Sequence, residues 1–267
     1  STVSPSRVDA LLTCPLNAVL GQLVEGDSSN INLVRGNLAH AFLEALGRGA
    51  AAEPAKRLVL DAFDSLVEGP AWHREAERAD FERLIDRTHG WVLSSSVSLE
   101  PVGVEVPVTV DIGPEVTIRG FIDRLAKAGE DYVVVDLKTG TKVPSATSAK
   151  DNTQLMTYQL ALAHGQLVGA AAEPGSESHD VSIRTGDGLP RGGGVLVFPR
   201  SSAASVPTRE QATKPPEELA EFAQMLPALV AELRGPDLTA RENADCDRCP
   251  IRSICPVMNE GGLVTNA

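Results

Sequence analysis

The stretch YVVVDLKTG (132–140), with GFIDRL (120–125) shortly before it, decides the fold of this chain. A β-branched apolar run, typical of a buried strand, ends in Asp136, and Lys138 follows after one intervening residue. Side chains alternate faces along a strand, so Asp136 and Lys138 point the same way. GFIDRL also has the pattern of a strand. If the two strands pair, Asp123 joins the other two, and two carboxylates and an ammonium converge at one end of a sheet.

Carboxylates that lie this close need a compensating group. At about 4 Å, two of them repel by roughly 4 kcal/mol at an effective dielectric constant of about 20. A buried pair therefore takes up a proton, a salt bridge or a metal ion. The grouping suits a hard divalent cation such as Mg²⁺ acting on a phosphate. At this stage the alternative is that Lys138 is only a salt-bridge partner.

Composition indicates a soluble globular chain. Hydrophobic residues make up 42% of its 267 residues, and no apolar run approaches the roughly 18 residues needed to cross a bilayer. The net charge of -12 argues against a free-standing, high-affinity DNA-binding protein, because phosphate contacts need clustered Lys and Arg. It does not exclude a nuclease, since an empty metal site is itself acidic and a partner can hold the DNA. We expect no membrane association and a cytoplasmic location.

The spacing of apolar residues places helices on both sides of a group of strands. Helices are predicted at 4–20, 36–48, 54–68, 73–94, 151–165 and 215–234. Strands are predicted at 102–112, 116–125, 131–137, 181–185 and 194–200, with Gly- and Ser-rich stretches at 174–180 and 186–194. Gly113-Pro114 is expected to form a hairpin turn. This order predicts an α/β domain whose central mixed sheet is flanked by helices.

The four cysteines indicate a metal or cluster site. Cys246, Cys249 and Cys255 follow the spacing C-x2-C-x5-C, and Cys14 lies more than 230 residues earlier. Disulfides are not expected, because nothing indicates secretion. Zinc sites are usually built from two local pairs, so three local ligands and one remote ligand favour a [4Fe–4S] cluster over Zn²⁺. The simplest alternative is a buried, structural Cys14 and a tail that binds nothing.

A cluster held in this way would tie the first helix to the last segment of the chain. It would close a loop of over 200 residues. Metal-site formation of this kind can contribute on the order of 10 kcal/mol to folding. We therefore expect the cluster to act as a structural staple, while redox sensing is not required.

In this order, the motifs resemble those of the PD-(D/E)xK nuclease superfamily. More narrowly, the chain resembles the RecB-type nuclease domain of bacterial helicase–nuclease complexes, in the iron–sulfur branch that includes AddAB and AdnAB. The resemblance covers nearly the whole chain and rests on SPSRVDALLTCP (4–15), GNLAHAFLEAL (36–46), VEVPV (104–108), GFIDRL, VVVDLKTG, QLMTYQLAL (154–162) and CDRCPIRSICP (246–256). It implies a restriction-endonuclease-like core with an iron–sulfur staple that joins the N- and C-terminal segments.

The resemblance implies a metal site with named ligands. His40, Asp123 and Asp136 would bind Mg²⁺ or Mn²⁺, with the Leu137 carbonyl as a further ligand. Glu105 would support these ligands or bind a second ion. Without the resemblance, a lone histidine on a helix and a glutamate on a strand would be ordinary structural residues.

The resemblance also implies three residues that act on the substrate. Lys138 would orient the attacking water and stabilise the charge that develops on the phosphate. Gln154 and Tyr158 are four residues apart and therefore lie on one face of a helix, where they would hold a DNA phosphate or the lysine. Every catalytic position of the pattern is filled, so we expect an active nuclease.

We expect one RecB-type nuclease domain over residues 1–267, which is the C-terminal part of a longer helicase–nuclease chain. Within it, 1–100 is a helical region, 101–200 the nuclease core, and 201–267 the last helix with the Cys-rich segment. The expected substrate is single-stranded DNA, delivered by a helicase motor in the same chain and a second helicase–nuclease subunit. The expected role is end resection at double-strand breaks and recombinational repair, on the nucleoid of a bacterium.

Two other hypotheses remain open at this stage. One is a stand-alone iron–sulfur exonuclease of the CRISPR-adaptation type. The other is a non-catalytic module that binds DNA ends or a partner protein. The intact group of Asp123, Asp136 and Lys138 argues against the second, because a retired site has no reason to keep a buried carboxylate pair.

Overall fold

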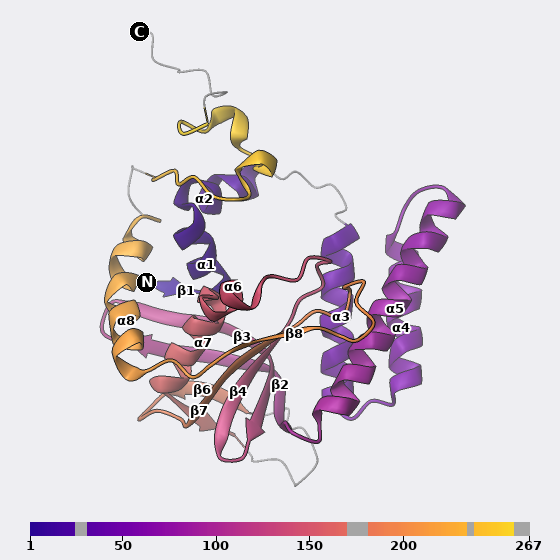
Figure 1. Cartoon of the computed structure of the whole chain (residues 1–267), viewed down its shortest axis with the longest axis horizontal. Helices are drawn as coiled ribbons and strands as arrows, with labels where there is room; N and C mark the ends of the chain where they lie inside the picture. The colour runs from indigo at the N-terminus through magenta and orange to yellow at the C-terminus, as the bar shows by residue number, and fades with distance from the viewer. Residues whose placement is uncertain (25–30, 170–180, 234–237, 259–267) are drawn as a thin grey trace.

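A computed structural model describes residues 1–24, 31–169, 181–233 and 238–258 (Figure 1). The stretch 174–180 lies outside the described residues. The helices are α1 (Pro5–Thr13), α2 (Pro15–Val24), α3 (Ile31–Gly47), α4 (Ala52–Leu66), α5 (Ala71–Ser95), α6 (Ala146–Lys150), α7 (Thr153–Ala163) and α8 (Pro216–Ala231), with short 3-10 helices η1 (Cys246–Arg248) and η2 (Arg252–Ile254). The strands are β1 (Thr2–Val3), β2 (Glu100–Ile112), β3 (Val116–Ala128), β4 (Asp131–Leu137), β5 (Gly165–Val168), β6 (Ser182–Thr185), β7 (Arg191–Val197) and β8 (Thr208–Gln211).

The eight strands found in the described residues belong to one mixed sheet. Its order is β5-β6-β2-β3-β4-β7-β8, and β1 pairs with β3 off this path. The hairpins β2–β3 and β3–β4 are antiparallel, whereas β4 pairs with β7, and β2 with β6, in parallel. The first hairpin turns at Gly113, whose φ of 64° is in the left-handed region that glycine tolerates. The predicted α/β fold with a mixed central sheet flanked by helices is confirmed.

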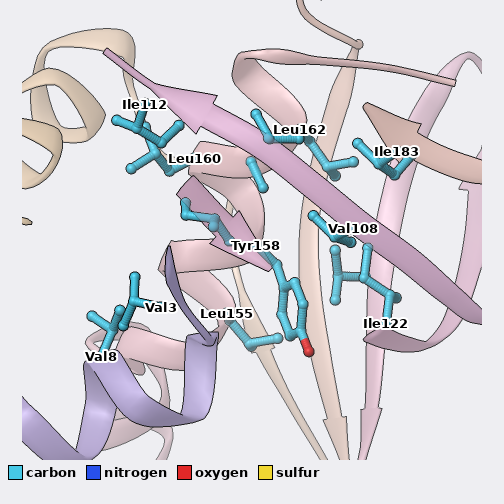
Figure 2. Close-up of a cluster of buried hydrophobic side chains, with 14 of the residues drawn as sticks. Val3, Val8, Val108, Ile112, Ile122, Leu155, Tyr158, Leu160, Leu162 and Ile183 are labelled. Atoms are coloured by element: carbon cyan, nitrogen blue, oxygen red, sulfur yellow. The ribbon is translucent and has the colours of Figure 1, made fainter. Parts of the chain in front are cut away.

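Helices cover the sheet from both sides, as Figure 1 shows. On one side, α1, α7 and α8 form a core with sheet residues such as Val134 and Leu196. On the other side, α3, α4 and α5 form a second core with Val135 and Leu137, the neighbours of Asp136 in β4. Strand β4 is therefore buried on both faces, which explains its continuous apolar run. Figure 2 shows Tyr158 in the first core, with its hydroxyl group at the edge of the cluster.

The predicted helix 4–20 is wrong in one respect, because two helices cover this segment. Its start is as expected, since the Ser4 hydroxyl accepts a hydrogen bond from the Arg7 backbone N–H and Pro5 is in the first turn. Between α1 and α2, Cys14 is extended, with φ -163° and ψ 105°. The physical reason is Pro15, which disfavours helical geometry at the residue before it.

Several short elements of the described residues were not predicted from the sequence: β1, α6, β5, β8 and the two 3-10 helices. The predicted helix 151–165 is shorter in the structure, because Asn152 caps α7 and the chain turns into β5 after His164. The predicted strand 194–200 is shifted, since β7 runs from Arg191 to Val197. Strand β8 has the sequence TREQ, which carries no apolar alternation. Its pairing with β7 gives it its conformation.

Two buried glutamines connect β8 to the start of α7. Gln159 is fully buried, and its Nε2 donates to Gln211 Oε1 at 2.9 Å. Gln211 Nε2 in turn donates to the carbonyls of Lys150 (3.0 Å) and Asn152 (2.9 Å). These carbonyls end α6 and lead into α7, so the glutamine pair fixes the helix that carries Gln154 and Tyr158.

Replacing Gln211 by Ala is expected to lower the free energy of unfolding by about 1–3 kcal/mol, because the buried partners of its side chain lose their hydrogen bonds. Urea denaturation of both proteins measures the difference. Gln166→Ala is the matched control, since Gln166 is exposed on β5. If both variants unfold at the same urea concentration, the glutamine pair contributes no stability.

The Cys-rich segment lies against the first two helices, as Figure 1 shows for α2. The Leu16 N–H donates to the Thr239 carbonyl at 3.0 Å. Arg241 Nη1 donates to the carbonyl of Leu11 at 3.1 Å, near the end of α1. The Cys249 thiol lies 3.4 Å from Asn17 Oδ1 in α2. The N- and C-terminal parts of the described chain are thus in direct contact.

Within the described ranges, no helix combines the length and the apolar character that a membrane span needs.

Candidate active site

The candidate site lies where β3 and β4 stop pairing. The last paired residues are Arg124 and Val135, and the next step in this register brings Asp123 level with Asp136. Asp123 Oδ2 accepts a hydrogen bond from the Leu137 N–H at 2.7 Å. The two carboxylates predicted to converge therefore lie together at the end of the paired stretch of β3 and β4.

Asp136, Lys138 and Gln154 form a closed triangle. Lys138 Nζ lies 2.7 Å from Asp136 Oδ2 and donates to Gln154 Oε1 at 2.6 Å. Gln154 Nε2 donates to Asp136 Oδ1 at 2.8 Å. The amide of Gln154 thus contacts both charged groups and fixes their separation. Helix α7 delivers this amide, which is why the cap of the helix at Asn152 matters for the site.

The Asp136 carboxylate is buried and forms an ion pair with Lys138. Its Oδ2 lies 2.7 Å from the Lys138 ammonium, and its Oδ1 accepts the hydrogen bond of Gln154. Burial raises the pKa of Asp136, and the Asp123 charge adds to this, while Lys138 acts in the opposite direction. An electron-rich oxygen in this position is suited to a cation.

His40, Glu105 and Asp123 form a second group beside the triangle. One ligand atom from each lies within 4.8 Å of the others. His40 Nδ1 is 3.4 Å from Asp123 Oδ1 and 3.9 Å from Glu105 Oε1. Helix α3 supplies the histidine, β2 the glutamate and β3 the aspartate. Glu105 has a φ of 46°, and it is the one described residue other than glycine with a positive φ. Such strained backbone is concentrated at functional sites.

The pKa values of Glu105 and His40 are both raised. Burial raises the pKa of Glu105 to about 7, and the Asp123 charge raises it further than His40 lowers it. For His40, burial alone would lower the pKa, but the Asp123 hydrogen bond and the surrounding carboxylates outweigh it, so the pKa is raised. The folded protein thus favours a proton, or another cation, at this point.

The donor set fits a divalent cation. Carboxylate oxygens are the ligands that Mg²⁺ and Mn²⁺ prefer. The group of three potential ligands includes Glu105, which was expected to support the ligands or bind a second ion. Asp136 lies outside that group and contacts Lys138 instead. Leu137 contributes its N–H to Asp123, and its carbonyl as a ligand stays a prediction.

Tyr158 is buried, and its hydroxyl donates to the Phe121 carbonyl. Burial raises its pKa, as do Asp123 and Asp136, so it is a neutral donor at physiological pH. The hydrogen bond ties α7 to β3 two residues before Asp123. In this structure Tyr158 therefore positions the strand, and a contact with DNA phosphate stays a prediction.

The four cysteines, all among the described residues, form no disulfide. Cys14 and Cys255 are buried, while Cys246 and Cys249 are partly exposed. The Cys246 sulfur accepts a hydrogen bond from the Asn243 N–H at 3.2 Å. Among the described residues, the sulfurs do not form a compact ligand group of the kind that His40, Glu105 and Asp123 form. The contacts with α1 and α2 bring the C-terminal cysteine segment to the region of Cys14.

We expect Mn²⁺ to raise the melting temperature more at pH 8 than at pH 6. The pKa of Glu105 is raised to about 7, so at pH 6 a cation must displace a proton and its apparent affinity is about tenfold lower. The raised pKa also means that this carboxyl stabilises the metal-free fold most at low pH, and the contribution is lost as the pH rises through about 7. A bound cation offsets that loss. Thermal melts with and without Mn²⁺ at both pH values measure the effect.

Glu105→Gln should remove most of this pH dependence. Glu100→Gln is the matched control, because Glu100 is exposed at the start of the same strand. Equal metal-induced shifts at both pH values in the unmodified protein would show that Glu105 does not compete with the cation for a proton.

Comparison with known proteins adds three findings. The sequence model of the family described as "PD-(D/E)XK nuclease superfamily" matches residues 2–256. No curated protein matches the chain. Among solved structures, one described as "Crystal structure of SSO0001" is similar with a TM-score of 0.42 and 15% sequence identity, over 96% of this chain and 87% of that one.

Proposed function

The chain belongs to the PD-(D/E)XK nuclease superfamily, and from this premise we propose that it is a Mg²⁺- or Mn²⁺-dependent deoxyribonuclease acting on single strands. Membership in the superfamily implies a metal-dependent nuclease. The observation that carries the proposal is the placement of Lys138 and Asp136, 2.7 Å apart, beside the group of His40, Glu105 and Asp123. The residues that can bind a metal ion thereby lie next to the Lys138 ammonium, an arrangement suited to phosphodiester hydrolysis.

The cation would be held by His40, Asp123 and Asp136, with the Leu137 carbonyl and Glu105 as further candidates. When bound, it would polarise the phosphate and make a water more acidic. The Asp123 carboxylate is kept in place by the Leu137 N–H, so its second oxygen can face the ion. The buried Asp136 carboxylate, which lies against Lys138, provides a further negative group.

Lys138 would orient the attacking water and stabilise charge on the phosphate. An ammonium has three donors, so it can keep its contacts with Asp136 and Gln154 and still donate to a water or a phosphate oxygen. Gln154 would hold this ammonium in a fixed position, so little reorganisation is needed during the reaction. Tyr158 would hold the strand or a DNA phosphate.

Incubation of the purified protein with labelled single-stranded DNA tests the proposal. We expect short products with Mn²⁺ or Mg²⁺, and none when EDTA removes the metal. The same reaction with blocked 5′ and 3′ ends separates exonuclease from endonuclease cleavage. A persistent lack of cleavage, in the isolated protein and in its parent complex, would favour the non-catalytic DNA-end-binding or partner-binding module.

We further propose that Cys14, Cys246, Cys249 and Cys255 bind a [4Fe–4S] cluster, with Zn²⁺ as the alternative. Support comes from the C-x2-C-x5-C spacing and from the contacts that hold this segment on α1 and α2, beside Cys14. Iron and acid-labile sulfide in anaerobically purified protein, measured against zinc, distinguish the two.

The biological setting belongs to the same proposal. We place the chain as a single nuclease domain in a longer helicase–nuclease polypeptide that works with a second subunit on double-strand-break ends in the bacterial cytoplasm. The RecB-type order of motifs supports this setting. Reading the gene upstream of this domain tests it, since an ATPase motor should be encoded there. A gene that encodes only this domain would favour the stand-alone exonuclease.

A further inference from the structure

Phe121 is the exception among the phenylalanines of this chain. Five of the six are buried in the two cores, with exposed fractions of 4% or less: Phe42, Phe63, Phe81, Phe198 and Phe222. Phe121 is 57% exposed. A single exposed apolar side chain is common on protein surfaces, so the position of this one must carry the argument.

Phe121 lies on the strand that leads into the candidate active site, two residues before Asp123. Alternation along β3 puts both side chains on one face, about 7 Å apart along the strand. Gly120 confirms the alternation, because a Cβ at that position would point at Pro5 and Tyr158 on the opposite face. The phenylalanine ring is therefore on the same face of the strand as the proposed metal ligand.

The strand holds Phe121 in a fixed position. Its carbonyl accepts the hydrogen bond of the buried Tyr158 hydroxyl, and it pairs with Pro107 of β2. Arg119 lies two residues before Phe121, further from the site, where it pairs with Thr109 and is exposed. A carboxylate, an aromatic ring and a guanidinium thus follow one another along one face of β3.

We propose that Phe121 is a stacking platform for a base of single-stranded DNA next to the bond that is cut, with Arg119 contacting a phosphate further along. The inference rests on the proposed function and names the form of substrate that the site recognises. An aromatic ring beside a metal site can stack on a base only if that base is not already stacked in a duplex. The platform therefore favours single strands without reading their sequence, because every base has a flat face.

Fluorescence anisotropy with a labelled oligo-dT tests this, in protein that also carries Asp136→Asn so that no cleavage occurs. Phe121→Ala is expected to weaken binding by about 5- to 150-fold, and Phe121→Trp to retain it. Binding of duplex DNA should change little. Trp72→Ala is the matched control, since Trp72 is an aromatic residue with 72% exposure on α5. Equal melting temperatures show that all variants are folded.

A series of oligonucleotides with one abasic site at successive positions locates the stacked base. One position should weaken binding when Phe121 is present and have no effect in Phe121→Ala. Unchanged single-strand affinity in Phe121→Ala, or an equal loss on every oligonucleotide, would overturn the inference. The inference would also be overturned if Phe121→Ala bound DNA normally but no longer bound a partner protein.

The two proposals can fail separately. If the unmodified protein shows no metal-dependent cleavage but binds single strands through Phe121, the proposed nuclease function fails and the platform stands. If cleavage is normal and Phe121→Ala binds as the unmodified protein does, the nuclease stands and the platform fails.

Discussion

Replacing Asp136 by Asn is expected to reduce DNA cleavage by about 10³-fold or more while the protein stays folded. Asn keeps the shape of the side chain and can still contact Gln154, but it removes the negative charge that faces the cation and Lys138. The fold should tolerate the change, because burial disfavours the Asp136 charge and raises its pKa. The melting temperature in EDTA at pH 8 is therefore expected to be equal or higher. Single-turnover cleavage of a labelled single strand in Mn²⁺ measures the rate.

The matched control is Asp131→Asn, which makes the same substitution at the exposed start of the same strand. It should leave the rate unchanged. Lys138→Ala should cause a loss comparable to that of Asp136→Asn, because the two side chains act at one point. Full activity in both Asp136→Asn and Lys138→Ala would remove the basis for the proposed active site.

Replacing Cys249 by Ser is expected to remove the visible absorbance and the bound iron of the purified protein and to destabilise it severely. If the four cysteines hold a cluster, its loss costs on the order of 10 kcal/mol, which is comparable to the total stability of a typical domain, about 5–15 kcal/mol. If they bind nothing, the change should cost below about 1 kcal/mol, since the thiol is partly exposed and has one weak contact with Asn17. This large difference separates the two readings.

Iron content, the absorbance spectrum and a thermal melt measure the result for Cys249→Ser. Cys14→Ser should match it, although the two residues are far apart in the chain. Ser253→Ala is the control, because Ser253 is an exposed residue of η2 between two of the cysteines. A Cys249→Ser protein with unchanged stability and unchanged metal content would exclude the staple.

The sequence predicted the central hairpins because their cause is local. Alternating apolar residues placed β2 and β3 on either side of Gly113, and the β-branched run of β4 indicated a strand buried on both faces. The same alternation brought Asp136 and Lys138 to one face, and the pairing of β3 with β4 explains the position of Asp123. The cap at Ser4 also depends on neighbouring residues alone, and it is present.

Other features depend on residues that are distant in the sequence. Strand β8 has no alternation and is extended because it pairs with β7. Gln159 and Gln211 are polar residues that a sequence pattern would place at the surface, but the structure buries them as partners of each other. Phe121 shares its face with Asp123 by simple alternation, yet its exposure depends on which helices cover that part of the sheet.

The sequence by itself predicted the main helices, the hairpins of the mixed sheet and the convergence of Asp123, Asp136 and Lys138, since the alternation of side chains along a strand follows from local sterics. Residue patterns alone do not point to His40 or Glu105; the family resemblance implied them, and only the tertiary structure shows one ligand atom of each within 4.8 Å of one on Asp123. It also showed that Gln154 bridges Asp136 and Lys138. Such contacts join side chains from different elements, so they depend on how the helices pack on the sheet. No local pattern records that packing.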